Sequence, residues 1–399
     1  MRIAILTSGI LPVPAVLGGA VENLIDYYLE YNNQHQLHDI TVYSITPPKP
    51  FTITNTINVH YHYIDTYSWW GRMKRHLYIR THSSHYYDPY IEYYLNEAIK
   101  DISKKEYDII ILENRPGFAI PISRISNAKI IIHLHNDLLN INSYKAKEIC
   151  QMTHKIITVS NFIKSRVETI GVNIPIETVY NGINLQNFHH ATPIDRKTLG
   201  FNEDDFIVVY SGRLIKEKGI EELIDAFIQL KLYPSIKLLV LGGSFYGVSK
   251  NNLFIEKLKD KCEKIKSRIV FTGFIPYEQL SQYLKIGDIA VVPSTWEEPF
   301  GLTCVEAIAT GLPLIVTNSG GIPEAVNDKC AILINKTNLK EEISKAILDL
   351  YTNINLRNTM QNNGIERSLK FSKENYSTQF LTNLTTDIIS VPLKSGSSY

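Results

Sequence analysis

Cysteine is scarce in this chain, and the few copies are scattered. The four cysteines among 399 residues form no CxxC pair, which argues against a disulfide framework and a zinc site. Long apolar runs are also missing, since none approaches the roughly 18 residues that a membrane-spanning helix needs. The charge is balanced, with 41 Lys and Arg against 40 Asp and Glu, so no overall field favours nucleic acid. We expect a cytoplasmic protein that does not cross a membrane.

Short runs of Ile, Val and Leu alternate with amphipathic stretches along the whole sequence. This pattern is typical of parallel strands joined by crossover helices. The first apolar run meets two prolines before any cleavage site, so we interpret it as a strand and not as a signal peptide. One predicted series of strands is 2–7, 40–44, 108–112, 129–134 and 155–159, with helices at 21–31 and 90–102. A second series is 206–210, 237–241, 269–272, 289–292 and 313–316.

The length suits two domains of about 150–200 residues each. The stretch 181–205 is polar and lacks strong periodicity, so we interpret it as the linker between them. The predicted division is an N-terminal domain over 1–182, a C-terminal domain over 183–372 and a final segment over 373–399 with a frayed tail. The fold class is therefore α/β, with one parallel sheet in each domain.

Two common phosphate-binding motifs are absent. The sequence has no GxxxxGK[ST] and no intact GxGxxG after a strand, which removes the main support for P-loop and nicotinamide enzymes. Gly18 and Gly19 follow the first strand and precede a helix, where N–H groups suit an anion, although a plain turn is the alternative. Arg213 and Lys218 lie between a strand and a helix, as a diphosphate clamp would. A solvated charged loop is the alternative for them.

The most distinctive segment, residues 293–326, is PSTWEEPFGLTCVEAIATGLPLIVTNSGGIPEAV. Two of its glutamates, Glu298 and Glu306, are separated by seven residues. The break at 299–301 predicts that Glu298 lies in a loop and Glu306 in a helix over 302–309. Such carboxylates can accept hydrogen bonds from sugar hydroxyls. The backbone N–H groups at the helix start would face a phosphate; they belong to Gly301, Leu302 and Thr303.

With these motifs, the sequence from residue 2 to about residue 350 resembles retaining glycosyltransferase family 4, whose members have the GT-B fold. EEPFGLTCVEAIATGLP is the most specific part, and Arg213, Lys218 and NSGGIPEAV also match. The resemblance implies two Rossmann-like domains with parallel sheets facing across a cleft, and a C-terminal helix that returns to the N-terminal domain. It implies transfer of a sugar from a nucleotide donor, a UDP-sugar by family frequency, with retention of configuration.

The resemblance also implies residue roles. Glu298 would bind the hydroxyls of the donor sugar and Glu306 those of the ribose, while Arg213 and Lys218 would stabilise the leaving diphosphate. His135 would lie near the donor sugar; the alternative is a core histidine, since His133 precedes it on the same strand. Further donor contacts are expected at Gly18, Gly19, Gly242, Phe274, Ile275, Phe300, Gly301, Leu302 and Thr303. GGSFYG at 242–247 departs from the family pattern. No cofactor or metal is expected, because no DxD motif follows a strand.

The acceptor side is less distinctive. Asn114 and Arg115 come just past the carboxyl end of a strand and are candidates for acceptor binding. The stretch 66–87 has no acidic residue and four Lys or Arg residues beside Trp69 and Trp70, which suits an anionic membrane surface or a lipid-diphosphate acceptor. The alternative is a solvent-facing helix with its tryptophan anchored in the core.

Taken with the resemblance, these features predict a metal-independent retaining hexosyltransferase that builds a bacterial surface polysaccharide or envelope glycan. Its acceptor would be a glycan or a lipid-linked molecule, and the enzyme would be cytoplasmic or peripheral at the inner face of the membrane. Two alternatives stay open, a GT-B nucleotide-sugar epimerase and a noncatalytic coat or scaffold protein that kept the fold. The presence of all the expected charged residues favours an enzyme over a scaffold.

Overall fold

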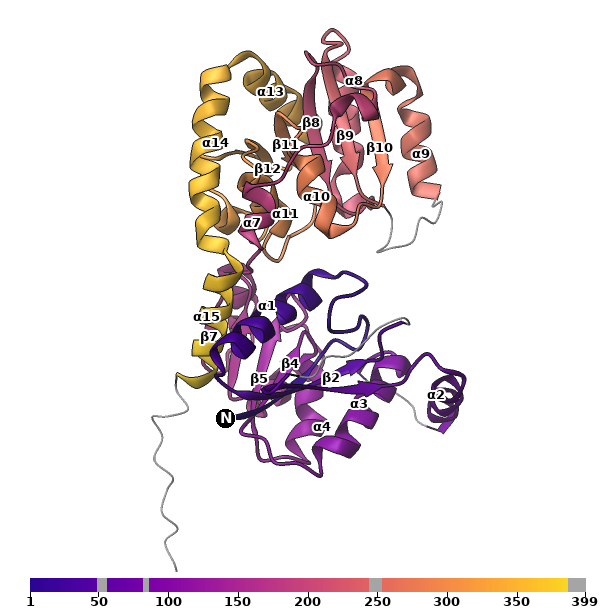
Figure 1. The fold of residues 1–399 in the computed structure, drawn as a ribbon, viewed down its shortest axis with the longest axis vertical. Helices are drawn as coiled ribbons and strands as arrows, with labels where there is room; N and C mark the ends of the chain where they lie inside the picture. The colour runs from indigo at the N-terminus through magenta and orange to yellow at the C-terminus, as the bar shows by residue number, and fades with distance from the viewer. Residues whose placement is uncertain (49–55, 82–85, 244–252, 387–399) are drawn as a thin grey trace, which may run out of the picture. The chain divides into compact units, whose positions relative to one another are not determined.

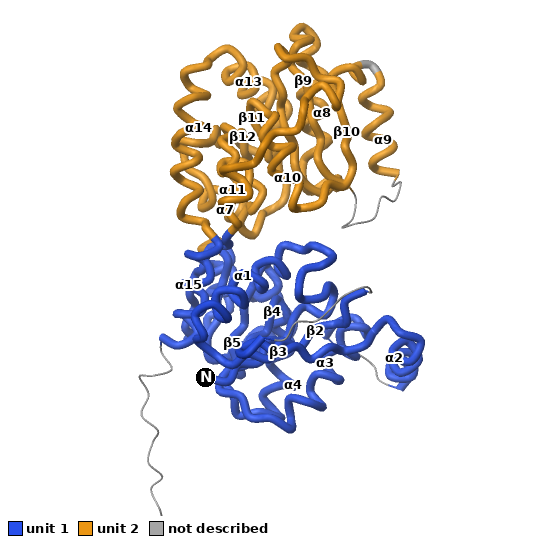
Figure 2. The backbone as a smooth tube through the Cα atoms, in the orientation of Figure 1, with its two compact units in different colours: residues 1–159, 163–182, 373–399 blue, residues 160–162, 183–372 orange. Residues whose placement is uncertain are grey.

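The computed structural model describes residues 1–48, 56–81, 86–243 and 253–386. The chain divides into two compact units (Figure 2). Unit 1 comprises residues 1–159, 163–182 and 373–399, and unit 2 comprises residues 160–162 and 183–372. The main division therefore falls between residues 182 and 183, and the segment from residue 373 belongs to unit 1.

Unit 1 contains a seven-stranded parallel sheet in the order β3-β2-β1-β4-β5-β6-β7. Figure 1 labels β2, β4, β5 and β7 of this sheet. Ile3 of β1 lies opposite Ile40 of β2 and Ile109 of β4. The strand order reverses between β1 and β4, and ligands of such sheets bind at the carboxyl ends of the strands there. The strands are β1 (Arg2–Leu6), β2 (Asp39–Ile45), β3 (Val59–Ile64), β4 (Ile109–Glu113), β5 (Lys129–Leu134), β6 (Lys155–Thr158) and β7 (Ile176–Thr178).

The C-terminal helix is part of the core of unit 1. Tyr28 of α1 stacks on Phe380 of α15 with ring centroids 4.5 Å apart, and both rings are fully buried. Burial of such large aromatic surfaces fixes the last helix to the first. The helices of this unit are α1 (Ala20–His35), α2 (Trp69–Thr81), α3 (Pro89–Ile102), α4 (Ala119–Ser123), α5 (Ala146–Gln151), α6 (Asn161–Glu168) and α15 (Lys373–Thr385).

Unit 2 contains a six-stranded parallel sheet in the order β10-β9-β8-β11-β12-β13. Its order reverses between β8 and β11, so the loops after these two strands flank the expected ligand site. The strands are β8 (Phe206–Ser211), β9 (Ile236–Leu241), β10 (Ile269–Gly273), β11 (Ile289–Val292), β12 (Leu314–Thr317) and β13 (Ala331–Ile334). The helices are α7 (Leu185–His189), α8 (Ile220–Gln229), α9 (Leu253–Lys261), α10 (Tyr277–Leu284), α11 (Leu302–Ala309), α12 (Ile322–Ala325), α13 (Leu339–Thr352) and α14 (Ile354–Ser368).

The structure contains elements that the sequence did not predict. The stretch 181–205, interpreted as the linker between the domains, contains α7 and a short 3-10 helix at 196–199, and Phe188 of α7 is buried. Strands β3, β7 and β13 were not expected. β3 alternates histidine and tyrosine and is half exposed, while β7 and β13 have only three and four residues, so none has the long apolar run that marks a buried strand.

The structure also describes the cysteines and the hydropathy of the helices. All four cysteines are free and buried. In the described part of the chain, every helix is too short or too polar to cross a membrane.

Candidate active site

The loop after β11 holds Glu298 in a charged, hydrogen-bonded setting. The side chain is buried, and its Oε1 accepts a hydrogen bond from Nζ of Lys218 at 2.6 Å and another from the hydroxyl of Ser294. Lys218 comes from the loop after β8, the neighbouring strand. The ion pair therefore lies where the strand order of unit 2 reverses. Ser294 was missed by sequence reasoning, although it lies four residues before Glu298 in the segment quoted above.

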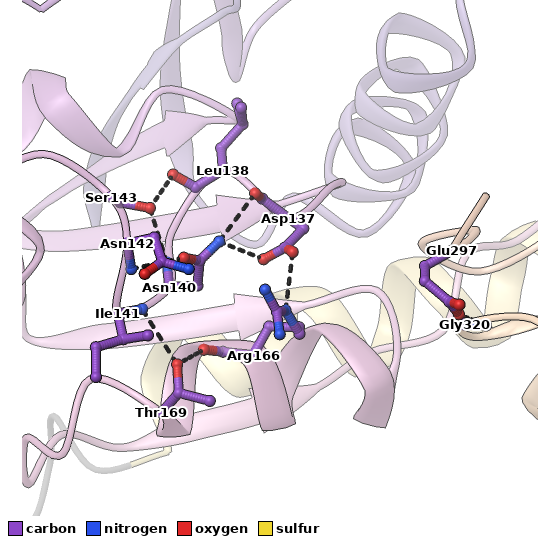
Figure 3. Close-up of polar contacts among 10 residues, drawn as sticks. All are labelled: Asp137, Leu138, Asn140, Ile141, Asn142, Ser143, Arg166, Thr169, Glu297 and Gly320. Carbon is purple, nitrogen blue, oxygen red and sulfur yellow. Dashed lines mark hydrogen bonds and ion pairs between the residues drawn. The ribbon is translucent and has the colours of Figure 1, made fainter. Parts of the chain in front are cut away.

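Glycines in the following loop hold the backbone of Glu298. Gly320 has a φ of 53°, and a Cβ on it would lie 2.1 Å from the carbonyl oxygen of Glu298. The N–H of Gly321 donates to that same oxygen at 2.7 Å. The N–H of Gly320 donates to Glu297 Oε2 at 2.6 Å, and Figure 3 shows these two residues next to each other. Glu297 pairs with Lys336 at 2.6 Å. A side chain at position 320 would push the loop from its place.

Glu306 lies in α11, behind the start of that helix. Burial raises the pKa of Glu306 to about 8, and a hydrogen bond with Tyr277 offsets part of the rise. Helix α11 covers 302–309, as predicted, and begins at Gly301 with a φ of 100°, no side-chain cap and no acidic residue in its first turn. Phe300, just before it, is buried. The uncapped N–H groups of Gly301, Leu302 and Thr303 favour an anion at this end.

Arg213 and Lys218 differ in their surroundings. Lys218 is paired with Glu298, and its Nζ lies 5.7 Å from the ring centroid of Trp296. Arg213 is exposed, and among the described residues its guanidinium has no ion pair. The backbone oxygen of Arg213 accepts a hydrogen bond from the hydroxyl of Tyr210 at 2.9 Å. The loop is thus fixed by its backbone while the guanidinium stays available to a ligand.

The remaining donor-contact candidates of unit 2 follow β9 and β10. Gly242 has a φ of 138°, and a Cβ there would lie 2.0 Å from the carbonyl oxygen of Gly212. Its N–H donates to the carbonyl of Gly273 at 2.9 Å, so the loops after these strands are tied together. Phe274 is 44% exposed and Ile275 is half-buried. Of the divergent loop 242–247, residues 244–247 lie outside the described residues.

In unit 1, Gly18 and Gly19 form the turn before α1, and both have positive φ. Gly19 has a φ of 114°, a backbone conformation that favours glycine, and a Cβ there would lie 2.2 Å from Oε2 of Glu22. Glu22 is buried in the first turn of α1, and burial raises its pKa to about 7. The hydroxyl of Ser8 donates to Glu22 at 3.3 Å. An anion at this turn would meet an acidic side chain, unlike one at the start of α11.

His133 and His135 share one carboxylate. Glu113, the last residue of β4, contacts His133 Nδ1 at 3.0 Å and His135 Nε2 at 2.9 Å, and it accepts a hydrogen bond from the hydroxyl of Tyr28 at 2.9 Å. Burial opposes ionisation of Glu113, but the two imidazoles lower its pKa to about 2. Burial lowers the pKa of His135 to about 4. The ligand atoms of Glu113, His133 and His135 lie within 4.8 Å of one another, and hydrogen bonds account for this spacing.

Asn114 and Arg115 are braced inside unit 1. Asn114 has a φ of 56°, and its Oδ1 accepts a hydrogen bond from the N–H of His135 at 3.2 Å. Nε of Arg115 donates to the carbonyl of Ser8 at 2.9 Å, and the guanidinium lies 5.1 Å from the ring centroid of Tyr87. Arg115 is only 8% exposed. Both side chains therefore order the loop beside His135, and their predicted contact with the acceptor stays a prediction.

Hydrogen bonds join the loop at residues 137–143 to Arg166 and Thr169 (Figure 3). Asp137 accepts hydrogen bonds from Asn140 Nδ2 at 2.8 Å and from Arg166 Nε at 2.8 Å. The N–H of Ile141 donates to the hydroxyl of Thr169 at 3.1 Å. These contacts fix the loop that follows β5, and with it the position of His135.

Comparison with known proteins agrees with this arrangement. A family model described as Glycosyltransferase Family 4 matches residues 31–187, and one described as Glycosyl transferases group 1 matches residues 191–367. The chain is a glycosyltransferase of the GT-B type. The two matched segments fall almost entirely within units 1 and 2, respectively.

Two relatives of this glycosyltransferase come from Bacillus subtilis (strain 168). The putative glycosyltransferase YtcC is 27% identical over 91% of this chain and 86% of its own length. Spore coat protein SA is 26% identical over 95% of this chain and 96% of its own length. A lipopolysaccharide 1,2-N-acetylglucosaminetransferase of Salmonella typhimurium is 30% identical over 60% of this chain and 62% of its own length.

Solved structures with the same fold include Anabaena Alr3699/HepE in complex with UDP and glucose, with a TM-score of 0.72 and 19% identity. The alignment covers 97% of this glycosyltransferase and all of that chain. Sucrose-phosphate synthase from Thermosynechococcus elongatus has a TM-score of 0.76 and 20% identity over 98% of this chain and all of its own. The expected fold of two Rossmann-like domains with parallel sheets is thereby confirmed.

Proposed function

We propose that this glycosyltransferase transfers a hexose from a UDP-sugar to a glycan or lipid-linked acceptor, with retention of anomeric configuration, in the synthesis of a bacterial surface polysaccharide or envelope glycan. The observation that carries the proposal is the Lys218–Glu298 pair at the reversal of strand order, with buried Glu306 in the adjacent helix. Cations at this point of the sheet match the central diphosphate of a nucleotide-sugar, and carboxylates match the hydroxyls of the ribose and of the sugar on either side of it.

The donor is held by unit 2 in this proposal. Lys218 has three N–H donors, so it can keep its bond to Glu298 and still bind a phosphate oxygen. Arg213 supplies a second cation, and the start of α11 supplies backbone N–H groups. Glu306 accepts hydrogen bonds from the ribose and Glu298 from the transferred sugar. These cations supply the positive charge that metal-dependent transferases take from an ion, so no metal or cofactor is required.

The choice of UDP and of an envelope acceptor is supported by similar proteins. Anabaena Alr3699/HepE has been solved in complex with UDP and with UDP-glucose. Relatives also include an alpha-monoglucosyldiacylglycerol synthase of Acholeplasma laidlawii, 29% identical over 49% of this chain, beside the lipopolysaccharide enzyme. His135 and the acceptor candidates Asn114 and Arg115 belong to unit 1.

Calorimetry with UDP, GDP and several UDP-sugars tests the donor. We expect UDP to bind to the wild type and more weakly to Lys218→Ala. Lys329→Ala changes an exposed residue elsewhere in unit 2 and should leave the affinity for UDP unchanged. Proton NMR of the product then gives the anomeric configuration. A protein that binds no nucleotide would be a scaffold, and interconversion of the free UDP-sugars without transfer would show an epimerase. Product of inverted configuration would exclude the retaining mechanism.

We further propose that α2 contacts an anionic membrane surface. The tryptophans of this helix are not anchored in the core, as the alternative interpretation required, because Trp69 is 66% exposed and Trp70 is 62% exposed. Gly71 is the buried residue of the helix. Arg72 and Lys74 are exposed beside the tryptophans, as is Arg80 at the end of the helix. An exposed aromatic and basic helix suits the interface of a bilayer with anionic lipids, at the inner face of the membrane.

Liposome co-sedimentation tests this contact. Each basic side chain contributes about 1 kcal/mol near an anionic surface, so changing Arg72, Lys74 and Arg80 together to Ser should release most of the protein from anionic vesicles. The matched control changes Lys329, Lys340 and Lys345 of unit 2, which are equally exposed. Binding should also weaken at high salt, as the Debye length falls from about 10 Å at 0.1 M to about 3 Å at 1 M. Equal sedimentation of both triple variants would refute the contact.

A further inference from the structure

The carboxylate of Glu113 is the centre of a buried hydrogen-bond network at the ends of β4 and β5. Its partners are the hydroxyl of Tyr28 at 2.9 Å, Nδ1 of His133 at 3.0 Å and Nε2 of His135 at 2.9 Å. The side chains of Glu113 and His133 are 0% exposed, and that of His135 is 5% exposed.

The network determines which nitrogen of His135 carries the proton. An ionised carboxylate only accepts hydrogen bonds, so each imidazole nitrogen that faces Glu113 must be protonated. The proton of a neutral His135 therefore lies on Nε2, and its Nδ1 carries a free lone pair. The same argument places the proton of His133 on Nδ1 when that ring is neutral. The pKa of His135, which burial lowers to about 4, keeps this ring neutral at physiological pH.

The other nitrogen of His135 is left without a partner. Nδ1 is buried and has no hydrogen bond to any of the residues that the structure describes. A buried acceptor that receives no hydrogen bond costs free energy. In native proteins such a group usually accepts a hydrogen bond from a water or a ligand. The backbone around it is fixed, because Asn114 holds the N–H of His135 and Asp137 holds the loop that follows.

We propose that Glu113 is a positioning residue that fixes His135 in the Nε2–H tautomer, so that His135 offers Nδ1 as an acceptor to a hydroxyl of a sugar bound at the carboxyl end of β5. The part that concerns the sugar rests on the proposed function, whereas the tautomer follows from the network alone. With a neutral amide in place of the carboxylate, an NH₂ donor could face the ring, the proton could move to Nδ1 and the acceptor would be lost.

The tautomer is measured first, by long-range proton–nitrogen NMR of the full chain labelled with ¹⁵N-histidine, with His135 assigned through His135→Gln. We expect a protonated Nε2 and an unprotonated Nδ1 in the wild type near neutral pH. Glu113→Gln should convert His135 to a mixture of tautomers, whereas Glu106→Gln, which removes an exposed carboxylate of the same unit, should not. A wild-type His135 protonated on Nδ1, or on both nitrogens, would overturn the proposal without reference to activity or to the folding of a variant.

Kinetics then test the consequence for transfer. In folded Glu113→Gln we expect kcat to fall about tenfold or more with little change in the KM of the donor, because a hydrogen bond to the reacting sugar is lost while the nucleotide site is intact. Tyr28→Phe keeps both histidine contacts and should retain more activity than Glu113→Gln. An unchanged kcat in Glu113→Gln would overturn the positioning role. If the wild type transfers no sugar from any donor while the tautomer is as expected, the proposed function fails and the assignment of the proton stands.

Discussion

Replacing Glu306 with Gln should make unit 2 more stable at alkaline pH. The pKa of Glu306 rises from its usual 4.5 to about 8 on folding, mainly through burial. The folded protein therefore keeps a proton that the unfolded chain has lost, and stability falls as the pH rises from about 4.5 to about 8. Because one unit of pKa is worth about 1.4 kcal/mol, the loss between pH 5 and pH 9 is about 4 kcal/mol. Gln keeps the size of the side chain and cannot ionise.

The assay is urea unfolding followed by tryptophan fluorescence at several pH values. The chain has three tryptophans, and a background with Trp69→Phe and Trp70→Phe leaves Trp296 as the reporter of unit 2. In this background, the free energy of unfolding of Glu306→Gln minus that of the parent should grow by about 4 kcal/mol from pH 5 to pH 9. Glu342→Gln, an exposed change on α13, should leave the difference flat. A difference for Glu306→Gln that stays constant or shrinks with pH would refute the reasoning.

The protonation of Glu306 should also be coupled to the binding of the nucleotide. If the ribose hydroxyls donate to ionised Glu306, binding of UDP near pH 7 must release about one proton. Calorimetry in buffers of different ionisation enthalpy measures this number. Glu306→Gln should bind UDP more weakly and release no proton, while being the more stable protein. Proton release that is equal in both proteins would assign the titration to another group.

The remaining predictions concern the diphosphate clamp, the metal and the glycine loop. Arg213→Ala and Lys218→Ala should each lower kcat about 10²-fold in a folded protein, because each charge partner of the leaving diphosphate is worth roughly 3 kcal/mol; wild-type rates would exclude the clamp. Transfer should continue in excess EDTA, and a loss that manganese restores would contradict metal independence. Gly320→Ala should lower the Tm of unit 2 more than Gly200→Ala, because both have positive φ but only the first would place a Cβ against the backbone of Glu298; equal losses would contradict this steric argument.

Local features of the sequence predicted the elements around Glu298 well. The apolar run 289–292 and the break at 299–301 are signals within a few residues, and β11 and α11 have the predicted bounds. The helix α7 within 181–205 was not predicted, because its position depends on distant residues and not on a local signal. Phe188 is buried through contacts with distant parts of unit 2, among them Tyr277 at 6.0 Å between ring centroids. A five-residue helix has no periodicity that reveals such packing.

The network around Glu113 shows a second limit of sequence reasoning. Asn114 and Arg115 attracted notice because they follow the end of a strand, yet both brace the fold. From the sequence, no role was assigned to Glu113. A carboxylate at the end of a fully apolar strand is unusual, and this feature could have indicated a functional residue. The register in which the strands pair cannot be derived from the sequence. Glu113 lies opposite His133 only because β4 pairs with β5 in this alignment.

The two glutamates of unit 2 lie in different electrostatic settings, although only seven residues separate them. Glu298 has an ammonium and a hydroxyl within hydrogen-bond distance, so its charge is compensated before any substrate arrives. Glu306 has a hydrogen bond with Tyr277, which does not compensate its burial. Since a buried charge is tolerated only when paired or fully hydrogen-bonded, Glu306 becomes a carboxylate when a ligand brings donors to it. In the proposed function, Glu298 therefore meets the sugar with its hydrogen-bond partners already in place, whereas the charge of Glu306 depends on the nucleotide.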